Sequence, residues 1–197
     1  MRRAMVRPGR DRLAGTVEVD ETYVGTAEEG VRGRQTEKKS IVVIAVETRK
    51  PKGLGRIRLR HVPNVSAHSL TSFVREAVEP GSVVCTDGWR GYSPLAMSGY
   101  GHEKNVLSTS GDPAHVVMPG VHRVASLLKR WLLGTHQGAV SPEQLDYYLD
   151  EFTFRFNRRH SRARCLLFYR LVQQAVQVPP APYKTLVGGR PATGRKG

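Results

Sequence analysis

Apolar and alternating segments mark the first part of the chain. Residues 16–24 alternate β-branched with polar side chains, residues 41–45 form a short apolar run, and residues 57–62 alternate with a period of two. Because successive side chains of a strand point to opposite faces, these patterns predict three β-strands. The polar, Gly-rich residues 25–39 are expected to connect the first two.

A helical repeat follows at residue 66, and a fourth strand follows the helix. After the candidate N-cap Ser66, apolar side chains recur at steps of three and four, at Leu70, Phe73, Val74, Ala77 and Val78. Pro80 and Gly81 are expected to end this helix, and residues 82–86 form the next apolar segment. The order strand, strand, strand, helix, strand, with an acid at the first and fourth strands, predicts an α/β fold with a ribonuclease-H-like mixed sheet, if those two strands are neighbours.

The second half of the chain predicts a loop followed by C-terminal helices. After residue 89 we expect a long turn-rich loop, and then a helix over 121–133 that ends at Gly134. The Ser-Pro pair at 141–142 matches the start of a second helix, because Ser is a favoured N-cap and Pro a favoured first helical residue. A third helix is expected over 163–176.

These elements predict one domain between two basic ends. Residues 1–15 are basic and contain Gly and Pro, as in a linker or the remnant of a preceding domain. The ribonuclease-H-like domain is expected over 16–176, with the C-terminal helices included. Residues 177–197 are rich in Pro, Gly and basic side chains, and we expect this tail to be disordered.

The chain is strongly basic, with 31 Lys and Arg against 17 Asp and Glu and a net charge of +14. This excess favours binding to a phosphate backbone, although a solvated cationic surface or a ribosome-associated protein would carry a similar charge. Cys85 and Cys165 lie far apart, which excludes a CxxC metal motif and a disulfide framework. No apolar run resembles a membrane span or a signal peptide, so we expect a cytoplasmic, nucleoid-associated protein with no membrane partner.

Two aspartates at the ends of predicted strands are the main candidates for chemistry. Asp20 lies in the first predicted strand, and Asp87 directly follows the fourth. In a chain that binds a polyanion, carboxylates on strands either destabilise the fold when buried without a partner or bind a hard divalent cation. A two-metal site for Mg²⁺ or Mn²⁺ usually takes a third ligand from a later helix, and His122 stands near the expected spacing.

Four segments resemble a known family: residues 17–25, 86–92, 126–136 and 148–159. They read Val-Glu-Val-Asp-Glu-Thr-Tyr-Val-Gly, Thr-Asp-Gly-Trp-Arg-Gly-Tyr, Ser-Leu-Leu-Lys-Arg-Trp-Leu-Leu-Gly-Thr-His and Tyr-Leu-Asp-Glu-Phe-Thr-Phe-Arg-Phe-Asn-Arg-Arg. The chain is similar to the catalytic domain of DDE-type bacterial insertion-sequence transposases. The subgroup it resembles begins with a zinc ribbon and has a variable third catalytic residue, followed seven positions later by Lys. His122 and Lys129 occupy these two positions here.

The resemblance implies metal-dependent cleavage of DNA strands by water and strand transfer by a DNA 3′-hydroxyl. It implies that Asp20 and Asp87 bind the metal ions. It also implies that His122 stands at the third catalytic position and that Lys129 contacts DNA. The implied partners are the insertion-sequence ends and target DNA, bound by a homo-oligomer. Basic side chains are expected to bind phosphates, at Lys129, Arg130, Arg155, Arg158, Arg159 and Arg162.

Each candidate residue also has a simpler interpretation. Asp20 could cap a turn at a strand end, and Asp87 precedes Gly88 in a sequence typical of turns. His122 could be an ordinary residue at the start of a helix. Glu21 follows Asp20 but is expected on the opposite face of the strand, so we do not expect it to be a ligand.

The function of the whole chain has alternatives as well. Because no Cys-rich zinc ribbon precedes the core, we expect an N-terminally truncated transposase. One alternative is an inactive remnant that binds DNA without sequence specificity, and another is a metal-dependent nuclease without strand transfer. Whether Asp20 and Asp87 meet in space distinguishes an enzyme from a DNA-binding protein.

Overall fold

The computed structural model describes residues 2–6, 9–25, 39–49, 53–105, 117–137 and 140–180. The chain divides into two compact units, Asp11–Ala139 and a second unit formed by Met1–Arg10 with Val140–Gly197. The predicted connection and most of the predicted tail, residues 26–38 and 181–197, lie outside the described residues. Within the described residues, no helix is both long and apolar enough to cross a membrane.

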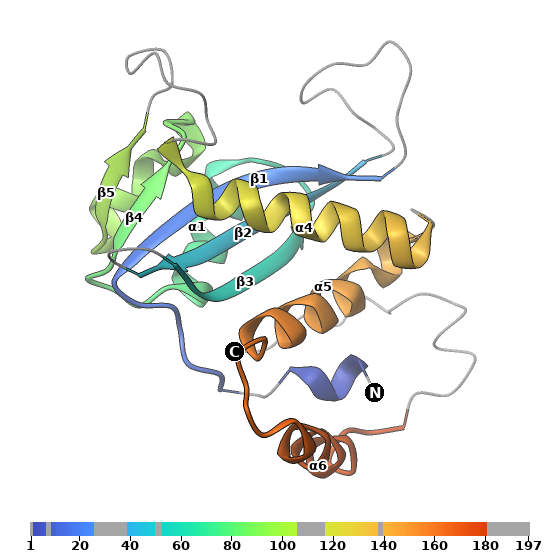
Figure 1. Cartoon of the computed structure of the whole chain (residues 1–197). Coiled ribbons are helices and arrows are strands. Elements are labelled where there is room, and N and C mark those ends of the chain that lie inside the picture. Colours follow the sequence, from blue (N-terminus) through green and yellow to red (C-terminus); the bar gives the residue numbers. More distant parts are fainter. Residues whose placement is uncertain are drawn as a thin grey trace. The chain divides into compact units, whose positions relative to one another are not determined.

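A five-stranded mixed sheet forms the centre of the larger unit (Figure 1). Its strands are β1 (Thr16–Val24), β2 (Ser40–Thr48), β3 (Leu54–Val62), β4 (Val83–Thr86) and β5 (Gly101–Lys104). The order is β3-β2-β1-β4-β5, in which the first three strands pair antiparallel and β4 runs parallel to both β1 and β5. The predicted α/β fold with a ribonuclease-H-like mixed sheet is confirmed, and β1 and β4 are neighbours.

Helices cover both faces of this sheet. α1 (Ala67–Ala77) begins at the predicted N-cap, where the Ser66 hydroxyl accepts a backbone N–H. Its apolar side packs in one cluster with Val17 and Val19 of β1. α4 (Pro119–His136) contacts β1 and β2, and Figure 1 shows α1 and α4 on opposite sides of the sheet. Alternation along β1 therefore directs odd-numbered residues toward α1 and even-numbered residues toward α4.

The predicted loop after residue 89 contains two further elements, the 3₁₀ helix η2 (Arg90–Ser98) and the edge strand β5. β5 has the sequence Gly-His-Glu-Lys, which lacks apolar alternation, and it is held by backbone pairing with β4. The expectation of a continuous loop was therefore wrong, because main-chain pairing at a sheet edge leaves no hydrophobic pattern.

α4 is longer than the predicted helix over 121–133. It begins at Pro119 and continues through Gly134 to His136, so the prediction that Gly134 ends it was wrong. A Cβ at Gly134 would meet nothing within 4 Å, which places this glycine on an open side of the helix. The C-cap is Gln137, whose φ of 52° is the left-handed conformation that often ends a helix.

The smaller unit contains the C-terminal helices that the sequence predicts. Its elements are η1 (Arg2–Met5), α5 (Pro142–Asn157) and α6 (Arg164–Ala175). Glu151 of α5 is buried and forms ion pairs with Arg2 at 2.6 Å and with Arg155 at 2.8 Å. The Arg2 guanidinium also lies 4.1 Å from the ring centroid of Tyr148. These contacts attach the N-terminal 3₁₀ helix to α5.

Candidate metal centre

Three carboxylates converge where β1 and β4 separate. One ligand oxygen from each of Asp20, Glu21 and Asp87 lies within 4.8 Å of the other two, and all three residues are half-buried. The parallel pairing of β1 with β4 ends at Glu18 and Cys85, so both aspartates follow the last pair on adjacent strands. The two aspartates that the sequence singles out therefore meet in space.

The segment around Asp87 folds into a tight turn for reasons that its sequence contains. One Asp87 carboxylate oxygen accepts the Trp89 N–H at 2.9 Å. Gly88 has a φ of 84°, a conformation that favours glycine. A Cβ at Gly91 would lie 2.7 Å from Trp89 Nε1 and 2.8 Å from Leu70 Cδ1, so a side chain has no room there. Asp87 is thus a turn residue and a member of the acidic cluster at the same time.

Glu21 joins the cluster, against the prediction from strand alternation. Asp87 follows the end of β4, and there the carboxylates of both Asp20 and Glu21 come within 4.8 Å of its own. The Tyr92 hydroxyl donates to Glu21 Oε2 at 3.1 Å. Complete burial of Tyr92 raises the pKa of its phenol well above its ordinary value, and the charges of Glu21, Asp20 and Asp87 add to this. The phenol therefore remains protonated, and its hydroxyl is a permanent hydrogen-bond donor to Glu21.

A polar pair, buried Thr86 of β4 and half-buried His102 of β5, supports the Asp87 turn. The Thr86 hydroxyl lies 3.0 Å from His102 Nε2 and accepts the Gly88 N–H at 3.5 Å. Thr86 is fully buried, and burial lowers the pKa of His102, as does the nearby Lys104. The neutral imidazole of β5 thereby contacts the residue that precedes Asp87.

The two candidates on α4 stand in different relations to the acidic cluster. His122 is half-buried in the first turn of α4, and it is not one of the three described residues that converge as possible ligands. Lys129 lies about two turns further along, at the surface. Partial shielding of its ammonium from water lowers the pKa of Lys129, as does Lys39, whereas Asp20 raises it. Lys129 is therefore near enough to Asp20 to interact with its charge.

The arginines that are expected to bind phosphates are exposed or half-buried: Arg130, Arg155, Arg158, Arg159 and Arg162. Two of them stack on rings of α5. The Arg158 guanidinium lies 3.9 Å from the ring centroid of Phe154, and that of Arg159 lies 4.0 Å from the ring centroid of Phe156. Cation–π contacts order these guanidinium groups without neutralising their charge.

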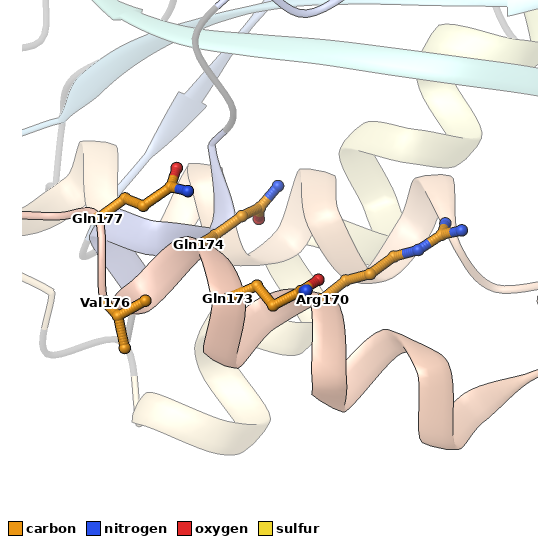
Figure 2. A pocket seen from close by; sticks show the side chains of 5 residues that line it. All are labelled: Arg170, Gln173, Gln174, Val176 and Gln177. Atoms are coloured by element: carbon orange, nitrogen blue, oxygen red, sulfur yellow. The ribbon is translucent and has the colours of Figure 1, made fainter.

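An open hollow on the last turns of α6 has a different chemistry. Figure 2 shows its lining, which consists of Arg170, Gln173, Gln174, Val176 and Gln177. The lining contains one cation and three amides but no carboxylate, imidazole or thiolate. Amide oxygens can contact a hard cation, but no carboxylate balances its charge here and Arg170 repels it, so this hollow is a poor site for a divalent metal ion.

A comparison with family models matches most of the chain. Residues 12–157 match the family model described as the ISXO2-like transposase domain. The chain belongs to this family. The part that matches the ISXO2-like transposase domain includes all five strands and the acidic cluster. An uncharacterized transposase-like protein of Haemophilus influenzae is 30% identical over 112 residues, which are 57% of this chain and 89% of that protein.

The donor set of this ISXO2-like transposase domain suits a divalent metal ion. Three carboxylates offer hard oxygen ligands, which Mg²⁺ and Mn²⁺ prefer. Three negative charges so close together also repel one another, and a bound cation relieves this repulsion. The cluster is a concentration of acids within a chain of net charge +14, so general surface acidity does not explain it.

Proposed function

We propose that this ISXO2-like transposase domain cleaves DNA strands and joins them to target DNA, using Mg²⁺ or Mn²⁺ held by Asp20 and Asp87. The observation that carries the proposal is the convergence of these two carboxylates just beyond the last pair of the neighbouring strands β1 and β4, in a chain of this family. When bound in a two-metal arrangement, such cations activate the attacking oxygen and stabilise the leaving oxygen.

The chain's own residues hold and orient this site. Asp87 is directed by its bond to the Trp89 N–H, which fixes one carboxylate oxygen. Glu21 offers a third carboxylate, and the Tyr92 hydroxyl orients it. One Asp20 carboxylate oxygen accepts the Glu21 N–H at 2.9 Å. Because each ligand is supported by a buried or backbone donor, the acids are arranged before a cation binds.

DNA is the macromolecular partner of this reaction. Lys129, which lies near the charge of Asp20, contacts a phosphate beside the scissile bond. Basic side chains of each unit are further candidates for phosphate binding, with Arg130 in the larger unit and Arg155, Arg158, Arg159 and Arg162 in the smaller. We expect a homo-oligomer to hold the insertion-sequence ends, and binding to chromosomal DNA implies a cytoplasmic, nucleoid-associated protein.

His122 has two candidate roles, a third metal ligand and a hydrogen-bonding contact to DNA or water. An imidazole ligand is neutral and is accepted more readily by Mn²⁺ than by Mg²⁺. If His122 is a ligand, the change His122→Glu should increase cleavage supported by Mg²⁺ relative to Mn²⁺. If His122 contacts only DNA or water, the metal preference should stay unchanged.

Strand nicking on a supplied element-end duplex tests the proposal. Wild type, Asp20→Asn and Asp87→Asn are compared in Mg²⁺ and in Mn²⁺, with Glu79→Gln as a control at an exposed carboxylate outside the cluster. Wild type and the control should nick, and both Asn variants should lose nicking in either metal. A folded wild-type protein that binds the duplex but nicks it in neither metal would support the inactive DNA-binding remnant instead.

A further inference from the structure

Glu18 is a buried carboxylate outside the acidic cluster, at the point where α4 begins. Only 7% of its surface is exposed, and Glu18 Oε2 accepts the Val121 N–H at 2.8 Å. The Gly120 N–H also bonds the carboxylate. A helix N-terminus leaves its first N–H groups without partners inside the helix, and a carboxylate there satisfies them and interacts favourably with the helix dipole.

Gly120 makes this contact possible. A Cβ at position 120 would lie 2.8 Å from Glu18 Oε2 and 3.0 Å from Leu54 Cδ2, closer than side-chain atoms normally approach. The first turn of α4 therefore lies directly against β1 and β3. In contrast, a Cβ at Gly134, near the other end of the same helix, would meet nothing within 4 Å.

The contact links the start of α4 to the strand that carries Asp20. Glu18 and Asp20 are two residues apart on β1 and share the face that α4 covers. α4 carries His122 directly after Val121, and it carries Lys129 near the charge of Asp20. A shift of the first turn of α4 would therefore move His122 relative to the acidic cluster.

We propose that Glu18 is a positioning residue for strand cleavage, which anchors the first turn of α4 so that His122 and Lys129 stand beside the acidic cluster. The inference rests on the proposed function, because it assigns those two side chains to the reaction. Glu18 itself is bound by backbone N–H groups of α4 and is not among the converging ligands.

Two substitutions at position 18 separate anchoring from direct metal binding. Glu18→Gln keeps a carbonyl oxygen for the Val121 N–H but removes the charge, whereas Glu18→Ala removes the acceptor. Gly120→Ala should displace the same turn from the other side, and Gly134→Ala is the matched control in the same helix. Hydrogen exchange of residues 117–128 reports the anchor, and nicking in Mn²⁺ reports the reaction.

Anchoring predicts that Glu18→Ala and Gly120→Ala lose protection of the first turn of α4 and nick about 10- to 100-fold more slowly. Glu18→Gln should retain both protection and most of the nicking, and Gly134→Ala should match the wild type. Cation affinity should be unchanged in all four variants, because Asp20, Glu21 and Asp87 are intact.

Two results would overturn the proposal. One is normal protection and nicking in Glu18→Ala. The other is loss of nicking and of cation affinity in Glu18→Gln with the turn still protected, which would make Glu18 a ligand. A wild type that nicks DNA in no condition would instead refute the proposed function. Hydrogen exchange of residues 117–128 would still show whether Glu18 anchors α4.

Discussion

Neutralising one acid of the cluster should stabilise the protein in the absence of metal. The carboxylate oxygens of Asp20, Glu21 and Asp87 lie within 4.8 Å of one another. Two unit charges at that separation repel by roughly 0.9 kcal/mol at the dielectric constant of water and by roughly 3.5 kcal/mol at an effective value of 20. Because all three residues are half-buried and accessible to solvent, we expect about 1 kcal/mol per pair.

Asp87→Asn is the suitable change, since the amide oxygen can still accept the Trp89 N–H that the carboxylate accepts at 2.9 Å. The variant loses repulsion with two neighbours, so its free energy of unfolding should rise by about 1 to 2 kcal/mol. A change of 1 kcal/mol moves the melting temperature of a chain of this size by about 2 to 4 °C. Glu79→Gln, at an exposed acid outside the cluster, should change stability by less than about 0.5 kcal/mol.

Thermal unfolding in low salt with a chelator measures this difference, and added Mn²⁺ should then reverse it. A cation that binds only the folded wild type stabilises it by about 2.7 kcal/mol at one hundred times its Kd, whereas Asp87→Asn should gain little. The advantage of the variant should also shrink as salt screens the repulsion. If Asp87→Asn melts below the wild type with chelator, or gains as much from Mn²⁺, the cluster is not a repulsive cation site.

Two further predictions concern the stability of the sheet and the binding of DNA. Glu47 is buried and accepts hydrogen bonds from Arg56 Nη2 at 2.6 Å and from the Ala14 N–H at 3.1 Å. Glu47→Ala should therefore lower the free energy of unfolding, measured in urea, by about 3 kcal/mol. This value is at the low end for a buried ion pair because the Arg56 side chain is 35% exposed. Burial alone would raise the pKa of Glu47, but its bonds to Arg56 and Ala14 outweigh this and lower the pKa below the ordinary 4.5. This carboxylate's stability contribution is therefore present above pH 4.5 and lost as pH falls through the lowered pKa, a loss that Glu47→Gln should not share. The affinity for a DNA duplex should fall as the salt concentration rises, with log Kd increasing linearly with log salt, because a net charge of +14 neutralises many phosphates. Phosphate contacts carry no base information, so we expect little sequence preference. Titration of a fluorescent duplex at several salt concentrations measures this, and a flat salt dependence would contradict it.

Elements with a hydrophobic face could be predicted from the sequence, whereas β5 could not. α1 buries one face and β1 places Val17 and Val19 in the core beside it, and such burial requires apolar residues at the period of the element. β5 exposes most of its four residues and is held by main-chain bonds, which any sequence can form. Gly134 misled the helix prediction, because glycine in an exposed helical position costs only about 1 kcal/mol and does not end a helix by itself.

The acidic cluster was predictable in part. Asp20 and Asp87 stand out because one lies within a strand pattern and the other directly after one, and their meeting follows once β1 and β4 are neighbours. Glu21 was missed, because strand alternation predicts the face of β1 from which a side chain leaves, but not that Asp87, beyond the end of β4, lies within reach of both Asp20 and Glu21. Glu18 was missed as well, since its partner Val121 is 103 residues away and no local pattern connects them.

Strand joining tests the central claim most directly. A duplex that carries a pre-cleaved element end with a 3′-hydroxyl is incubated with target DNA and Mn²⁺, and the covalent joined product is measured on a denaturing gel. We predict joined product with the wild type, none with a 3′-deoxy end, and none with Asp20→Asn or Asp87→Asn that still bind the duplex. Joining that persists in either Asn variant, or hydrolysis by the wild type with no joining, would contradict the assignment of strand transfer to this acidic cluster.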